Sequence, residues 1–407
     1  MIRKEIANGG SDAKVMTIMA AYSLISQASL GLSYPGVPLY LFYEGLSEGS
    51  INAILAFVAV ASLAGQVAWG YLSDRILTKL AFVKIGCAGN FIGYFILAGV
   101  KDPIAFALSY TVTSFVGSAS FPAAMAILAD HSTQRTRGRS MGIFWSAASI
   151  GWALSVAFTG WIIENLGGSF LFIFCALLNL ASLLVVLSLG SQSLRSSKNM
   201  ESKNRGSSFP LLISRLGRSF FIFFLATIVF FILDFAKNVY IPLYYSYEVK
   251  LGATLATLLL SFTSWIEVPA TVMFGILSDK VGRVKVVLVS YLLCSLFMLT
   301  NLIVDGLGLA ALAMGIYGLV WGAFSGASSA LASELVAEDF RGFAMGLFNS
   351  SYSFAAILAP VSIGAIIQTF GYKPSFYFMG IMMLFFVLAV KVGVRQAPKA
   401  EEAALKR

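Results

Sequence analysis

The chain has 407 residues, of which 58% are hydrophobic and 12% are charged, and its mean hydropathy is +0.84. Soluble domains carry about 25% charged residues, so this composition excludes an ordinary soluble protein. The net charge of +9 comes from 28 Lys and Arg residues against 19 Asp and Glu residues. In a soluble protein such an excess would suggest a nucleic-acid partner, whereas in a membrane protein it reports on topology.

Apolar runs long enough to cross a bilayer, about 20 residues each, recur along the whole chain. They predict an all-α membrane protein with twelve spans at residues 15–43, 51–72, 80–100, 104–128, 141–163, 170–189, 220–244, 253–277, 284–304, 307–332, 343–370 and 375–394. The polar residues 1–14 precede an apolar run that is too long for a signal peptide and has no evident cleavage site. We therefore expect the first helix to be retained.

The cysteines and the histidine give no sign of a metal or redox site. Cys87, Cys175 and Cys294 all lie within apolar runs and lack the short spacing of metal ligands. His131 is the only histidine, and it falls in a basic loop. There is no phosphate-binding Gly-x-x-x-x-Gly-Lys-Ser/Thr loop. We expect no metal, no cofactor and no ATP-driven mechanism of that type.

The positive residues predict the orientation of the spans. If the N-terminus is inside, 24 of the 28 Lys and Arg residues fall in inner segments, three fall in outer loops, and Lys237 falls within a span. Lys and Arg concentrate on the cytoplasmic side of membrane proteins. The pattern therefore predicts an even number of spans in the cell membrane with both termini in the cytoplasm.

The chain repeats itself with an offset of about 204 residues. Pro-Leu-Tyr at 38–40 recurs at 242–244, Gly-x-Leu-Ser-Asp at 70–74 recurs at 275–279, and Arg-Gly-x-x-Met-Gly at 137–142 recurs at 341–346. Such a repeat predicts two pseudo-symmetric six-helix bundles in the same orientation. We place the first bundle at 1–190, a basic cytoplasmic linker at 191–218, and the second bundle with its tail at 219–407.

With these residues in view, the chain resembles the major facilitator superfamily of secondary transporters. The family signature between helices two and three, Gly-x-Leu-x-Asp-Arg-x-Gly-Arg, has a degraded first copy and a fuller second copy. The first copy is Gly70, Leu72, Asp74, Arg75 and Lys79, and the second is Gly275, Leu277, Asp279, Lys280, Gly282, Arg283 and Lys285. The resemblance implies that these acids and cations form a gate that closes the cytoplasmic side; the alternative is that they only set topology.

A second pair of acids lies at the next predicted cytoplasmic loop of each half. Asp130 with Arg137, and Glu334 with Arg341, occupy matching places in the two halves. We interpret each acid and its arginine as a pair that belongs to the same gate.

Asp234, Lys237 and Glu267 lie deep within predicted spans, where charge is costly and by default functional. Asp234 and Lys237 are three residues apart on the seventh helix and hence on one face. They either pair to permit burial or bind a substrate or proton. Glu267 lies in the eighth helix without an opposite charge nearby in that helix. This carboxyl is a candidate proton carrier; the alternative is an acid that faces polar helix or the cytoplasmic cleft.

The resemblance also implies that helices one, four, seven and ten line a central cavity. The candidate cavity-lining residues are Tyr22, Gln27, Tyr34, Ser114, Trp145, Ser149, Trp152, Asn238, Tyr240, Trp321, Asn349 and Tyr352. No Arg lies in a predicted span, and phosphates or dicarboxylates are usually bound by Arg forks. The aromatic, sparsely charged lining therefore favours an amphipathic or apolar organic solute.

These features predict a monomeric secondary transporter that moves a small organic solute by alternating access, not an enzyme. We favour proton-coupled efflux, as in the drug and proton antiporters of the family. Two departures weaken that choice: Thr113 stands where many proton-coupled relatives carry Arg, and Trp152 stands where the drug-antiporter signature has Pro. The alternatives are proton-coupled uptake of an organic anion or metabolite with Lys237 as counter-charge, or a transport-inactive scaffold.

Overall fold

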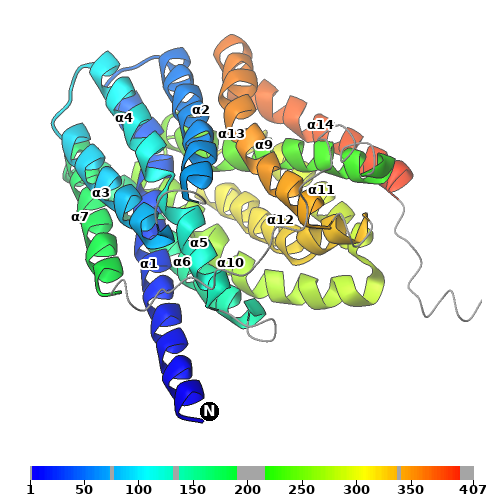
Figure 1. Ribbon diagram of the computed structural model, residues 1–407. Coiled ribbons are helices and arrows are strands. Elements are labelled where there is room, and N and C mark those ends of the chain that lie inside the picture. Colours follow the sequence, from blue (N-terminus) through cyan, green and yellow to red (C-terminus); the bar gives the residue numbers. More distant parts are fainter. Residues whose placement is uncertain (1, 74–77, 132–136, 190–215, 337–340, 395–407) are drawn as a thin grey trace, which may run out of the picture. The chain divides into compact units, whose positions relative to one another are not determined.

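The computed structural model describes residues 2–73, 78–131, 137–189, 216–336 and 341–394, and within these ranges it contains helices and no strand (Figure 1). The first seven helices are α1 (Ile2–Tyr43), α2 (Glu48–Ser73), α3 (Lys79–Leu97), α4 (Pro103–Gly117), α5 (Ser120–Asp130), α6 (Arg137–Asn165) and α7 (Gly168–Leu187). The others are α9 (Gly217–Tyr247), α10 (Gly252–Val281), α11 (Arg283–Thr300), α12 (Leu307–Glu334), α13 (Arg341–Phe370) and α14 (Tyr372–Gly393).

Twelve segments of the described chain are long and apolar enough to cross a membrane. Each coincides with a predicted span to within a few residues, so the prediction of an all-helical, twelve-span membrane protein is confirmed. One span, Pro103–Leu128, consists of two helices, α4 and α5. The break at Ser118 and Ala119 has a local cause, because Pro122 has no N–H for the Ser118 carbonyl and its ring crowds that oxygen.

The chain forms two compact units. The first unit is Met1–Glu201 together with Tyr245–Ser261, and the second is Ser202–Tyr244 together with Phe262–Arg407. The last residues of α9 and the first ten of α10 thus belong to the first unit, although the rest of both helices belongs to the second.

In the first unit, α1 packs closely against α6 because glycines remove side chains from the contact. A Cβ built on Gly151 would lie 2.0 Å from the Leu24 carbonyl oxygen, and one on Gly31 would lie 2.9 Å from the Trp152 carbonyl oxygen. The hydrophobic core beside this contact includes Tyr22, which is 0% exposed.

In the second unit, small residues bring α12 against α10. A Cβ built on Gly318 would lie 2.6 Å from the Ile266 Cβ, and one on Gly322 would lie 2.4 Å from the Ala270 Cβ. Since Ile266 and Ala270 flank Glu267 in sequence, this packing fixes the part of α10 that carries Glu267 next to α12.

Candidate functional site

The two charged residues of α9 form a buried ion pair in the second unit. Asp234 is 4% exposed and Lys237 is 6% exposed. The Lys237 Nζ lies 3.7 Å from Asp234 Oδ1. Residues three apart on a helix share a face, so the local geometry of α9 brings these two groups together.

Two polar neighbours complete this pair. Lys237 Nζ donates a hydrogen bond to Asn238 Oδ1 at 2.9 Å, and Asn238 Nδ2 donates to Asp234 Oδ2 at 3.2 Å. From α12, the Tyr317 hydroxyl donates to Asp234 Oδ1 at 2.6 Å, and the Tyr317 ring centre lies 4.6 Å from Lys237 Nζ. Each buried charge therefore has polar partners, which is the condition under which burial is tolerated.

Glu267 is a half-buried side chain on α10 that lies within electrostatic range of Lys237, Asp234 and Tyr317. The second unit thus gathers two acids and one base from two helices. If all three are ionised, the group carries one surplus negative charge. A net charge within a membrane span is costly unless it is compensated.

Tyr317 is the member of this site that the sequence analysis missed. It lies four residues before the predicted cavity residue Trp321, and residues at this spacing share a helix face. That spacing was the available signal. Its contact with Asp234 joins residues 83 apart in the chain, and no spacing rule predicts such a contact.

Aromatic side chains gather in the second unit on the same helices. The rings of Phe230 and Trp321 stack at 6.1 Å, those of Phe230 and Phe324 at 3.9 Å, and those of Phe231 and Tyr352 meet at 5.4 Å. Phe230 and Phe231 precede Asp234 by one turn of α9. A largely buried aromatic cluster therefore adjoins the charged group.

The remaining candidate residues of the second unit differ in exposure. Asn238 and Tyr240 are buried, Trp321 is half-buried, and Asn349 and Tyr352 are exposed. Of these five, Asn238 is hydrogen-bonded to the charged pair.

The first-unit candidates take part in separate local contacts. The rings of Tyr34 and Trp152 lie 5.8 Å apart. Ser114 donates to the Val58 carbonyl at 3.3 Å and so joins α4 to α2. Gln27 and Ser149 are half-buried and Trp145 is 48% exposed. Tyr22, expected to line the cavity, instead lies in the hydrophobic core, because its ring packs among apolar side chains of α3, α5 and α6.

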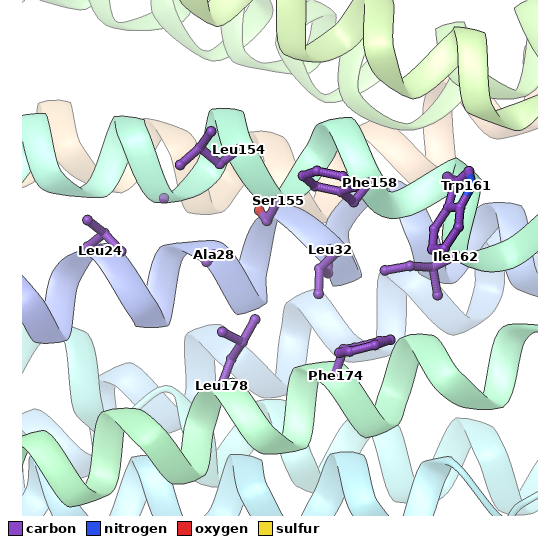
Figure 2. Close-up of a pocket in the computed structure, with 11 residues that line it drawn as sticks. Leu24, Ala28, Leu32, Leu154, Ser155, Phe158, Trp161, Ile162, Phe174 and Leu178 are labelled. Carbon is purple, nitrogen blue, oxygen red and sulfur yellow. The ribbon is translucent and has the colours of Figure 1, made fainter. Parts of the chain in front are cut away.

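A groove of about 370 Å³ lies in the first unit between α6 and α7, with α1 along it (Figure 2). Its lining includes Leu24, Phe158, Trp161 and Phe174, and the single hydroxyl there, of Ser155, is bonded to the Trp152 carbonyl. The groove thus offers mainly apolar contact.

The predicted gate residues form ion pairs within each unit. In the first unit Lys79 Nζ lies 2.7 Å from Asp130 Oδ2. In the second unit Arg283 Nε lies 2.7 Å from Glu334 Oε1, and Arg283 Nη2 lies 3.4 Å from Asp279 Oδ1. All three acids thus pair with a cation of the loop signature, Lys79 at the start of α3 or Arg283 at the start of α11.

The other predicted gate residues lie near these pairs or outside the described residues. Gly70 lies near the end of α2, and Gly275 and Lys280 lie near the end of α10. Gly275 packs against Gly326 on α12. Asp74 and Arg75 lie outside the described residues, and so do the side chains of Arg137 and Arg341. The predicted pairing of those two arginines with Asp130 and Glu334 therefore stays a prediction.

Comparisons with known proteins point to one family. The family model described as Major Facilitator Superfamily matches residues 19–244 and 223–407. An uncharacterized MFS-type transporter of Methanocaldococcus jannaschii is 22% identical over 374 residues, which are 89% of this chain and 91% of that one. A putative proline/betaine transporter of Staphylococcus aureus is 25% identical over 279 residues, which are 61% of this chain and 58% of that one.

Solved structures show the same fold. The crystal structure of a nucleoside transporter matches with a TM-score of 0.80 at 16% identity, covering 94% of this chain and 100% of that one. A D-xylose-proton symporter matches with a TM-score of 0.76 at 16% identity, covering 94% and 98%. Family and fold are those of transporters and not of enzymes. The chain, a multi-pass membrane protein with twelve spans, belongs to the Major Facilitator Superfamily of secondary transporters.

Proposed function

We propose that this transporter couples proton movement to the export of a small amphipathic solute, and that Asp234, Lys237 and Glu267 form its coupling centre. The observation that carries the proposal is the gathering of two acids and one base within the spans of the second unit. With all three groups ionised this centre has one excess negative charge, which a bound proton neutralises.

The proton and a cationic solute compete for the same centre in this mechanism. A positively charged group on the solute neutralises the excess charge as well as a proton does, so binding of the solute releases the proton. Because the proton and the solute exclude each other from the centre, the protein can exchange one for the other across the membrane. Proton entry then drives export of the solute.

The aromatic cluster beside the centre supports an amphipathic substrate. Ring faces attract cations, most strongly where water is excluded. The half-buried Trp321 and the exposed Tyr352, which contact Phe230 and Phe231, supply such faces near the charged group. The apolar body of the solute would pack on the same rings. We further propose that the protein is a monomer with both termini in the cytoplasm. It would expose this centre to each side of the membrane in turn, by alternating access.

Uptake of an organic anion or zwitterion is the second candidate, and the buried Lys237 favours it. Protonation of Asp234 would leave the Lys237 ammonium, now held at 3.7 Å from that carboxylate, to bind a carboxylate of the solute. Staphylococcal relatives carry the name putative proline/betaine transporter, and both of those solutes are zwitterions. In this case the proton and the solute travel together.

Transport in proteoliposomes with an internal pH dye tests both candidates. Lipophilic cations, proline, betaine and organic anions are added from either side, and wild type is compared with Glu267→Gln and Asp234→Asn. Export predicts that a cation drives proton movement in the opposite direction, whereas uptake predicts that proline, betaine or an anion moves with the proton. In both cases the two variants lose coupling.

Two results would contradict the proposal of proton coupling. Solute movement without proton movement would point to a uniporter or another coupling ion. Absence of movement for every compound, in vesicles whose protein binds none of them, would favour the scaffold alternative.

A further inference from the structure

Glu164 joins the end of α6 to the start of α10. This residue is not part of the proposed coupling centre. The Glu164 carboxylate accepts hydrogen bonds from the Ala253 backbone N–H and from the Thr254 hydroxyl. The first N–H groups of a helix lack partners within the helix and carry partial positive charge. A carboxylate at this position therefore binds the end of α10 strongly for an exposed side chain.

The contact continues along both helices as an antiparallel stripe, all within the first unit. The Gly160 N–H donates to the Thr257 hydroxyl at 3.0 Å, and the Ser261 hydroxyl donates to the Ala153 carbonyl at 2.7 Å. A Cβ on Gly160 would lie 2.1 Å from the Ala253 carbonyl oxygen, so only glycine allows this approach.

Aromatic rings at the ends of α1 and α9 make a second contact near the start of α10. The rings of Phe42 and Tyr247 lie 4.1 Å apart, and those of Tyr43 and Tyr247 meet at 5.6 Å. By the sequence repeat, α1 and α6 belong to the first half, whereas α9 and α10 belong to the second. The segment 245–261 of the second half is thus held on the first half by contacts from two helices.

We propose that Glu164 is a latch that holds the start of α10 against α6 and releases it once in each transport cycle. The inference rests on the proposed function, because rocking of the two halves in alternating access moves α10 relative to α6. On the topology set by the positive residues, the loops that follow α6 and precede α10 lie on the outer side. The latch therefore closes the exterior entrance.

A cysteine placed in the stripe reports whether the latch is closed. Thr257 is 0% exposed, and the three native cysteines are buried. We would measure the rate at which a membrane-impermeant maleimide, added from outside, labels Thr257→Cys, using the protein without that cysteine as background. The measurement is made without solute or pH gradient, so its outcome does not depend on whether the protein transports protons.

Loss of the carboxylate should open the contact. We expect Glu164→Ala to raise the labelling rate about tenfold, because two charge-assisted hydrogen bonds are lost. Glu164→Gln and Thr254→Val should give smaller increases, because each keeps part of the contact. If Glu164→Ala does not yield folded protein, as judged by gel filtration, Glu164→Gln carries the test.

Asp102 supplies a matched control on the same outer side. Its carboxylate caps α4 by accepting from the Ala105 N–H at 2.8 Å, but both residues belong to the first half. Asp102→Asn should leave the labelling rate unchanged. An unchanged rate in Glu164→Ala, or an equal increase in Asp102→Asn, would overturn the assignment of Glu164 as a latch.

Discussion

The offset of 204 residues relates one ion pair in each unit. Lys79 pairs with Asp130 in the first unit, and Arg283 pairs with Glu334 in the second, each at 2.7 Å. Each pair joins the start of one membrane span to the end of the next span, which in the first unit consists of α4 and α5, and all four groups are partly exposed. The repeat thus preserves a pair that organises helix ends within a half.

The same offset shows that the two halves differ in the charge of their interior residues. Asp234, Lys237 and Tyr317 correspond by the offset to Leu30, Ser33 and Thr113. Ser33 donates to the Leu30 carbonyl, and Thr113 donates to the Ser109 carbonyl, and neither side chain carries a charge at its place. The first half has uncharged residues at the places of Asp234 and Lys237, so the fold does not require charge there, and we propose that these costly charges serve transport.

Transplanting the first-half residues into the second half should give the largest effects. Asp234→Ala alone leaves Lys237 buried without its partner and should destabilise the protein by about 3–5 kcal/mol. The double variant Asp234→Leu/Lys237→Ser removes both charges and should regain most of that stability while losing proton coupling. Thermal unfolding in detergent and the proteoliposome assay measure the two effects. A double variant that still couples protons would contradict the role given to the pair.

Removal of one hydroxyl tests how the site is held together. Tyr317→Phe keeps the ring beside Lys237 but removes the donor to Asp234, and should cost about 1–3 kcal/mol of stability and reduce transport. Its counterpart in the first half, Thr113→Val, loses only a bond within its own helix and should cost about 1 kcal/mol or less. Equal losses of transport in both variants would mean that Tyr317 has no special role.

The ion pairs at the helix ends should give the smallest effects, and similar ones in both halves. Lys79→Ala and Arg283→Ala should each lower thermal stability by about 1 kcal/mol or less, because partly exposed ion pairs contribute little. Exchange of the charges in Arg283→Glu/Glu334→Arg should restore part of the loss. A large loss of transport in only one of the two alanine variants would instead show that the two ion pairs contribute unequally to transport.

The sequence predicted the parts of the fold that depend on local pattern. Apolar runs gave the twelve spans, and the spacing of Asp234 and Lys237 placed both on one face of α9, where they pair. Partners from distant segments were not predictable in this way. Tyr317 and Glu164 both act across helices, and helical periodicity gives the face of a residue but not the helix that faces it.

Proton release on solute binding tests the central claim most directly. Detergent-solubilised protein in weak buffer is mixed with a lipophilic cation identified in the transport assay, and the change in pH is compared with the amount of cation bound. We predict release of about one proton for each cation bound, since the two compete for one excess charge, and no release in Glu267→Gln. Cation binding without proton release, or undiminished release in Glu267→Gln, would contradict a shared coupling centre.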